Sequence, residues 1–227
     1  LTHQPLSFSV SETTEGVHIH IIDAELMGKG EKEKKDLYIE GVQNNGIINH
    51  YEYIINSEGT IEIRHVLKPE GKMPLWFPRI GLTLTVSDAL DQVKWYGRGP
   101  QENYPDRKTG YPMGIYASTV QAMYEPYLMP QDYGLRTDVR WLQLTTDKGI
   151  GLQFKMNEWF NFNIYPYSTD NLTKAMYTYQ LQKQKGMTLN LDYATTGVGC
   201  TARGVFGAYK AMPQEYRRTI SIRPMMK

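Results

Sequence analysis

The sequence predicts an all-β fold of the sandwich type, formed by a single domain over residues 1–227. Runs that alternate apolar and polar side chains recur along the chain, and clusters of Gly, Pro, Asn and Asp separate them. Aromatic residues make up 12% of the chain and include 17 Tyr, a residue type that favours half-buried strands. With 41% hydrophobic and 22% charged residues, the composition is that of a folded globular domain.

The first third of the chain predicts two hairpins. Residues 6–25 alternate on both sides of a turn at Gly16, and residues 47–55 and 61–67 flank a turn that contains Gly59. Between the hairpins, residues 29–36 carry charges of both signs and predict a solvated loop.

His18 and His20 fall on one face of the second predicted strand, and two His at this spacing can bind a metal. No third ligand follows at a recognisable spacing, so the favoured interpretation is a polar outer face. No metal ligand is therefore assigned.

The rest of the chain continues the β pattern, with one short helix. Residues 172–177 form the predicted helix body, which Ser168 or Thr169 can cap. Residues 117–133 have weak periodicity and are expected to be extended or irregular. The predicted strands are residues 80–86, 135–145, 150–156, 160–165, 188–193 and 219–222.

Residues 95–113 are the most distinctive stretch. Gly97, Gly99, Pro100 and Pro105 predict a long loop that is neither the interior of a helix nor a central strand. Its charged and aromatic side chains predict ion pairs that hold one loop shape. Glu102 and Asp106 could alternatively be an acid/base pair that acts on a glycosidic bond, but structural bracing is the favoured interpretation. The bracing set is Arg98, Glu102, Tyr104, Asp106 and Arg107, with Arg136 from a later strand.

Several function classes lack support in the sequence. The net charge of +1 gives no reason to expect nucleic acid or an anionic membrane as a partner. No apolar run approaches the roughly 18 residues that a membrane helix needs. The single cysteine, Cys200, excludes an internal disulfide, and without an assignable His partner it predicts a passive small residue.

The stretch GRGPQENYPDRKTG at residues 97–110 resembles the G-x-GPxExYxDRxxG segment of the last domain of large beta-galactosidases in glycoside hydrolase family 2. Further matches follow in the family's order, across roughly residues 91–216. They are residues 123–127 with M-Y-x-P-Y, 130–136 with P-Q-E-x-G-x-R, 162–168 with F-N-x-x-x-Y-S, 189–192 with L-N-I-D, and 197–199 with G-V-G.

This resemblance implies a β-supersandwich similar to aldose mutarotases. The chain begins at Leu1, and the family's R-A-P-x-D-N-D segment is absent, so we expect a domain truncated at its N-terminal side. The family's catalytic glutamates belong to a (β/α)-barrel domain that nothing here resembles. The resemblance therefore implies no catalytic residue in this chain, which alone is expected to be inactive, and no cofactor in this fragment. Magnesium and sodium are expected for the parent enzyme.

In the family, a loop reading G-x-G-G-D-x-S-W-G-A carries a Trp to the rim of the galactose pocket. The corresponding stretch here is residues 197–208. An ungapped match places Gly204 at the Trp position, whereas two extra residues place Phe206 there, which is the interpretation we prefer. Phe206 and Arg203 are accordingly the expected substrate-binding residues.

The resemblance implies three partners: the catalytic barrel of the parent chain, a beta-galactoside or other carbohydrate, and further copies in a homo-oligomeric parent. Two other functions stay open. The chain could be a stand-alone carbohydrate-binding or aldose-epimerase-like module, which the aromatic content favours. It could also be a purely structural interface domain, if Gly204 occupies the Trp position.

Overall fold

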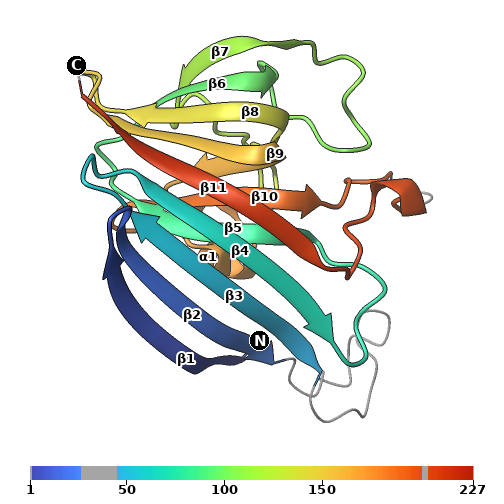
Figure 1. Ribbon diagram of the computed structural model, residues 1–227. Helices are drawn as coiled ribbons and strands as arrows, with labels where there is room; N and C mark the ends of the chain where they lie inside the picture. The colour runs from blue at the N-terminus through green and yellow to red at the C-terminus, as the bar shows by residue number, and fades with distance from the viewer. Residues whose placement is uncertain (1, 27–44, 201–203, 227) are drawn as a thin grey trace.

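A computed structural model describes residues 2–26, 45–200 and 204–226, and these residues form an almost entirely β structure (Figure 1). The predicted charged loop at residues 29–36 lies outside this description. The strands are β1 (Thr2–Thr13), β2 (Gly16–Leu26), β3 (Gly46–Ile55), β4 (Ile61–Glu70), β5 (Arg79–Val86), β6 (Gln92–Arg98), β7 (Met113–Thr119), β8 (Arg136–Thr145), β9 (Gly151–Tyr165), β10 (Met187–Thr195) and β11 (Tyr216–Met225). Among the described residues, no helix is long and apolar enough to cross a membrane.

The strands form one antiparallel hydrogen-bonded system that forks at β9. The main path runs β1-β2-β3-β4-β11-β9-β8-β6-β7, while β10 pairs with both β9 and β5. β9 is 15 residues long, and its two halves have different partners: residues 151–156 pair with β11, and residues 161–165 pair with β10. The fork lets β5 and β10 lie behind β4 and β11, as Figure 1 shows.

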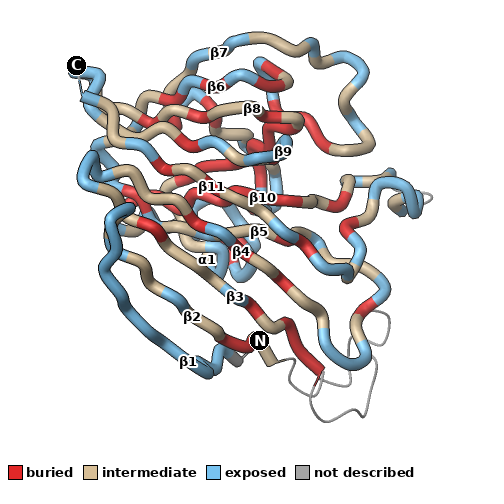
Figure 2. Tube along the Cα trace, viewed as in Figure 1, coloured by how far each residue is buried: buried red, intermediate tan, exposed pale blue. Residues whose placement is uncertain are grey.

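The main core fills the space between these layers. Every residue of β10 from Met187 to Tyr193 is buried, so this strand is covered on both faces. Figure 2 shows buried positions along β8, β9 and β10, in contrast to the exposed trace of β1. The largest fully buried side chains of the core cluster include Trp95, Leu142, Phe154, Phe160, Phe162, Leu189 and Leu191. This arrangement confirms the predicted all-β supersandwich.

The structure corrects the prediction that residues 95–113 form a loop throughout. Residues 95–98 belong to β6, which is a central strand because β7 and β8 pair with its two edges. Gly97 is needed there, since a Cβ atom at this position would lie 2.9 Å from Cγ2 of Val139. The loop itself spans residues 99–112. β7 was also missed: Met113 was expected in the loop, residues 117–119 in an irregular stretch, and residues 114–116 were assigned to no element.

Other boundaries differ in smaller ways. The two strands predicted over residues 150–165 are one strand, β9. The helix α1 (Thr169–Lys174) has the predicted cap, since Oγ of Ser168 accepts a hydrogen bond from the Asn171 amide at 3.1 Å. It ends earlier than predicted because the amides of Met176 and Tyr177 donate to the side chain of Gln180.

Candidate functional site

The loop at residues 99–112 and the segment at residues 196–209 meet through the side chain of Asp106. Its Oδ1 atom accepts a hydrogen bond from the Val198 amide at 3.0 Å, and its Oδ2 atom accepts one from the Gly199 amide at 2.7 Å. Gly197 lies against the same carboxylate, where an added Cβ atom would come within 2.3 Å of Cγ of Asp106. Gly199 has a φ of 66°, which favours glycine. This contact therefore constrains the residue types at positions 197 and 199.

Phe206 projects from the segment that Asp106 holds. It is the N-cap of the short 3-10 helix η2 (Gly207–Tyr209), and its side chain is 65% exposed. The segment closes on itself, because the Gly197 amide donates to the carbonyl of Tyr209 at 2.8 Å. In Figure 1 this segment is the connection between β10 and β11, and it contains the short red helix that has no label. Arg203, the other residue expected to contact substrate, lies outside the described residues.

The connection between β4 and β5 holds the residues on either side of this segment. The hydroxyl of Thr196 donates to the Phe77 carbonyl at 2.6 Å and accepts from the Ala211 amide at 2.9 Å. The Phe77 amide donates in turn to the Ala211 carbonyl at 2.9 Å. Both ends of the Phe206 segment are therefore attached to the body of the domain.

Glu102 lies at the buried end of the loop, with 3% of its surface exposed. Its carboxylate accepts hydrogen bonds from the Tyr127 hydroxyl, the Tyr104 hydroxyl at 3.1 Å and the Gly134 amide at 2.9 Å. Burial raises the pKa of Tyr104 and of Tyr127, which keeps both hydroxyls protonated as donors. Arg107 completes the set at 3.6 Å from Oε1 of Glu102.

Arg136 lies close to this group. It is buried, donates to the Gly134 carbonyl at 2.9 Å, and has its guanidinium carbon 5.4 Å from the centre of the Trp95 ring. Burial lowers the pKa of Arg136 to about 10, against the opposing charges of Glu125 and Glu102. The guanidinium therefore remains charged at neutral pH.

Arg98 holds the other end of the loop. Its guanidinium lies 2.6 Å from Oδ2 of Asp138 and donates to the Tyr111 carbonyl at 2.9 Å. Lys108 binds the second oxygen of Asp138 at 2.8 Å. Burial acts to raise the pKa of Asp138, but the hydrogen bonds from Lys108 and Arg98 outweigh it and hold this pKa below its usual value.

The six residues of the predicted bracing set therefore fall into three groups. Tyr104 and Arg107 contact Glu102, and Glu102 and Arg136 both bind the backbone of Gly134. Arg98 binds Asp138, and Asp106 reaches the Phe206 segment. Both carboxylates of the alternative acid/base pair accept hydrogen bonds from groups of this chain. An acid and a base acting together would need to reach one bond in the substrate, and these two carboxylates serve different contacts.

Sequence reasoning missed the partners that complete these contacts. Asp138 and Tyr127 lie in segments whose pattern gave no sign that they face the loop. The amides of Val198 and Gly199 have no signature in sequence, since every residue except proline carries one.

The chain is similar to known proteins along most of its length. The family model described as "Beta galactosidase small chain" matches residues 8–222. A beta-galactosidase of Priestia megaterium is 38% identical over 147 residues, which are 65% of this chain and 14% of that protein. A beta-galactosidase of Vibrio cholerae is 39% identical over 122 residues, or 54% of this chain and 11% of that protein. The chain thus spans a small part of these relatives.

Among solved structures, one similar chain is a GalM/aldose epimerase homologue from C. elegans. Its TM-score is 0.46 and its sequence identity 12%, over 96% of this chain and 68% of that chain.

Proposed function

Because the chain belongs to the beta-galactosidase small-chain family, we propose that it is the C-terminal domain of a beta-galactosidase. The longer parent enzyme hydrolyses terminal non-reducing beta-D-galactosides, and a (β/α)-barrel elsewhere in the parent supplies the catalytic glutamates. This chain packs on the barrel and contributes residues 197–208 to the sugar pocket. The length of the relatives supports this division, since the matched parts are 14% and 11% of two of them.

The observation that carries the proposal is the attachment of the Phe206 segment to the loop by Asp106. An exposed aromatic ring on a segment with fixed ends suits a platform for the apolar face of a sugar. A freely moving ring would lose more conformational entropy on binding, which would weaken the contact. We propose that Phe206 is this platform, with Arg203 as a polar contact in the same loop.

The other residues of the loop have a supporting role in this proposal. Glu102, Tyr104, Arg107, Arg136 and Arg98 hold the loop from which Asp106 reaches the segment. None of them acts on the glycosidic bond, and the isolated chain has no hydrolytic activity. Incubation of the purified chain with a chromogenic galactoside tests the last point. Hydrolysis that Glu102→Gln removes without unfolding the chain would contradict it.

The direct test of the proposal is the variant Phe206→Ala in the longer enzyme that carries the barrel. By analogy with aromatic pairs, the ring contributes about 0.5–1.5 kcal/mol, so kcat/KM for galactosides should fall roughly 2- to 12-fold. Ile150→Ala is a matched control, because Ile150 is an exposed apolar residue in the turn before β9. An unchanged kcat/KM for Phe206→Ala, with folding intact, would leave the domain as a scaffold without contact to the sugar.

A further inference from the structure

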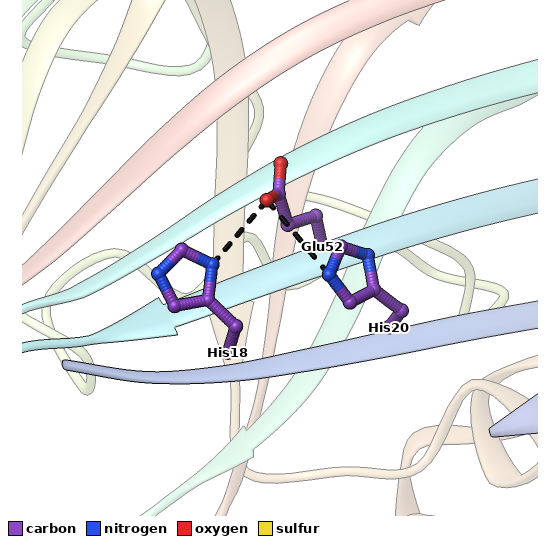
Figure 3. Close-up of side chains that lie close together, drawn as sticks. All are labelled: His18, His20 and Glu52. Carbon is purple, nitrogen blue, oxygen red and sulfur yellow. Dashed lines mark ion pairs between the residues drawn. The ribbon is translucent and has the colours of Figure 1, made fainter. Parts of the chain in front are cut away.

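Two histidines and one carboxylate converge on the sheet between β2 and β3, on strands that the proposed function does not use. His18 and His20 are two residues apart on β2, so their side chains share one face. The pairing of β2 with β3 places Glu52 directly opposite His20. Figure 3 shows both imidazole rings turned toward the same oxygen of Glu52.

The distances within this cluster suit a metal ion with three protein ligands. Nδ1 of His18 lies 3.4 Å from Oε1 of Glu52, and Nε2 of His20 lies 4.0 Å from the same oxygen. The ligand atoms all lie within 4.8 Å of one another. Ligands at about 2.1 Å in a tetrahedral arrangement lie about 3.4 Å apart, so small side-chain rotations bring all three onto one ion.

Arg64 orients the carboxylate for this role. Its guanidinium lies 3.1 Å from Oε2 of Glu52 and 2.8 Å from Glu62, which leaves Oε1 of Glu52 to face the histidines. Hydrogen bonds of this kind to a ligating carboxylate are typical of metal sites.

The cluster also borders open space. His20, Glu52 and Arg64 line a pocket of about 590 Å³, together with His50 and residues of β11. Three protein ligands leave at least one coordination position for water or another small ligand, and the pocket gives it access.

We propose that His18, His20 and Glu52 bind a divalent transition-metal ion of the zinc type. Two imidazole nitrogens and one carboxylate oxygen suit zinc and its neighbours, whereas magnesium and calcium prefer oxygen ligands alone. His18 and His20 come from β2 and Glu52 comes from the adjacent β3, so the bound ion links the two strands. Because it binds the folded hairpin, it also stabilises this part of the sheet. This assignment differs from the expectation of no metal ligand, because Glu52 becomes a neighbour of the two histidines only through the pairing of β2 with β3.

Calorimetric titration of the full 227-residue chain with ZnCl2 tests the proposal, with CoCl2 as a spectroscopic probe. We expect one equivalent of Zn²⁺ to bind, and bound Co²⁺ to give a visible absorption band of low-symmetry coordination. His20→Ala and Glu52→Gln should each weaken binding by at least about tenfold, since residues that merely orient a ligand are worth 10–100-fold. His20 is half exposed, so its substitution leaves the fold intact even if a change at the less exposed His18 does not.

Glu58→Gln is the matched control, because Glu58 is an exposed carboxylate in the turn between β3 and β4 and belongs neither to the cluster nor to the pocket lining. Its affinity for Zn²⁺ should equal that of the unmodified chain. The proposal is overturned if the chain binds no Zn²⁺, or if His20→Ala binds as tightly as the unmodified chain. It is equally overturned if Glu58→Gln loses as much affinity as His20→Ala, because the chain would then bind ions without a defined site.

Discussion

The carboxylate of Asp106 accepts a hydrogen bond of 2.7 Å from the backbone amide of Gly199, 93 positions further along the chain. This contact joins the loop after β6 to the segment between β10 and β11. The loop has its own buried anchor at Glu102, and the segment carries the exposed ring of Phe206. The position of Phe206 therefore depends on a loop that lies about a hundred residues earlier in sequence.

Asp106→Ala should release the Phe206 segment without unfolding the domain. The amides of Val198 and Gly199 lose a charged acceptor, which is worth about 1.5–3 kcal/mol per hydrogen bond. Hydrogen exchange at these two amides should therefore accelerate at least about tenfold. Asp147→Ala is the control, since Asp147 lies exposed in the turn between β8 and β9. Unchanged exchange at both amides would show that Asp106 does not hold the segment.

Gly197→Ala should disturb the same contact from the opposite side. The new methyl group would occupy the space of the Asp106 carboxylate, which must then move away from both amides. We expect faster exchange at Gly199, similar to that of Asp106→Ala. Gly207→Ala serves as the control, because a Cβ atom at Gly207 meets no atom within 4 Å. A protected Gly199 amide in Gly197→Ala would mean that the carboxylate has room to adapt.

Glu102→Gln should destabilise the domain. The amide group of Gln replaces an acceptor with a donor, and it faces the donors Tyr104, Tyr127 and the Gly134 amide. The expected loss is about 1–3 kcal/mol in the free energy of unfolding, measured by urea titration. Glu58→Gln, at an exposed position in the turn between β3 and β4, should cost almost nothing. If Glu102→Gln abolished hydrolysis in the longer enzyme at unchanged stability, Glu102 would be a catalytic residue.

His65 should make the domain less stable in mild acid. Its Nε2 atom donates to Oδ1 of Asn49 and its Nδ1 atom accepts from the Tyr193 hydroxyl at 2.7 Å, which is the neutral form of the ring. Burial lowers the pKa of His65 to about 4. The unfolded chain, with a pKa near 6.5, therefore binds the proton first as the pH falls.

The contribution of neutral His65 to the free energy of unfolding is fully present above about pH 6.5 and is lost as the pH falls toward 4. The slope is at most roughly 1.4 kcal/mol per pH unit. Urea titrations at pH 7 and pH 5 should show this loss, and His65→Gln should reduce the difference between the two pH values. His20→Gln, at a half-exposed position on β2, should keep the difference. An equal pH dependence in His65→Gln and the unmodified chain would assign the effect to other groups.

The sequence predicted the strands whose apolar and polar residues alternate along their whole length. It missed the strands whose extent depends on packing or pairing with neighbouring strands. β2, β3 and β4 have clear alternation and turn residues between them. Gly97 in β6 predicts a break in a strand, but the strand requires glycine there because Val139 of β8 packs against it. Likewise, only the pairing of β9 with both β10 and β11 explains why one strand runs through residues 151–165.

The candidate sites follow the same rule. Gly and Pro positions predicted a loop over residues 95–113, and the family resemblance matched residues 97–110 and the segment at residues 197–208. The hydrogen bonds between them run to backbone amides that no pattern identifies. His18 and His20 were visible as a pair because they lie on one strand. Glu52 becomes their neighbour only through the register of β3 against β2, which sequence alone did not supply.

A double-mutant cycle in the longer enzyme tests most directly whether Asp106 positions Phe206 at the sugar. It compares kcat/KM for galactosides in Asp106→Ala, Phe206→Ala and the double variant, with unfolding titrations to confirm that all three are folded. If Asp106 acts through the ring, each single variant lowers kcat/KM, and the double variant is no worse than Phe206→Ala alone. Strictly additive losses, or a loss in Asp106→Ala with none in Phe206→Ala, would contradict this account.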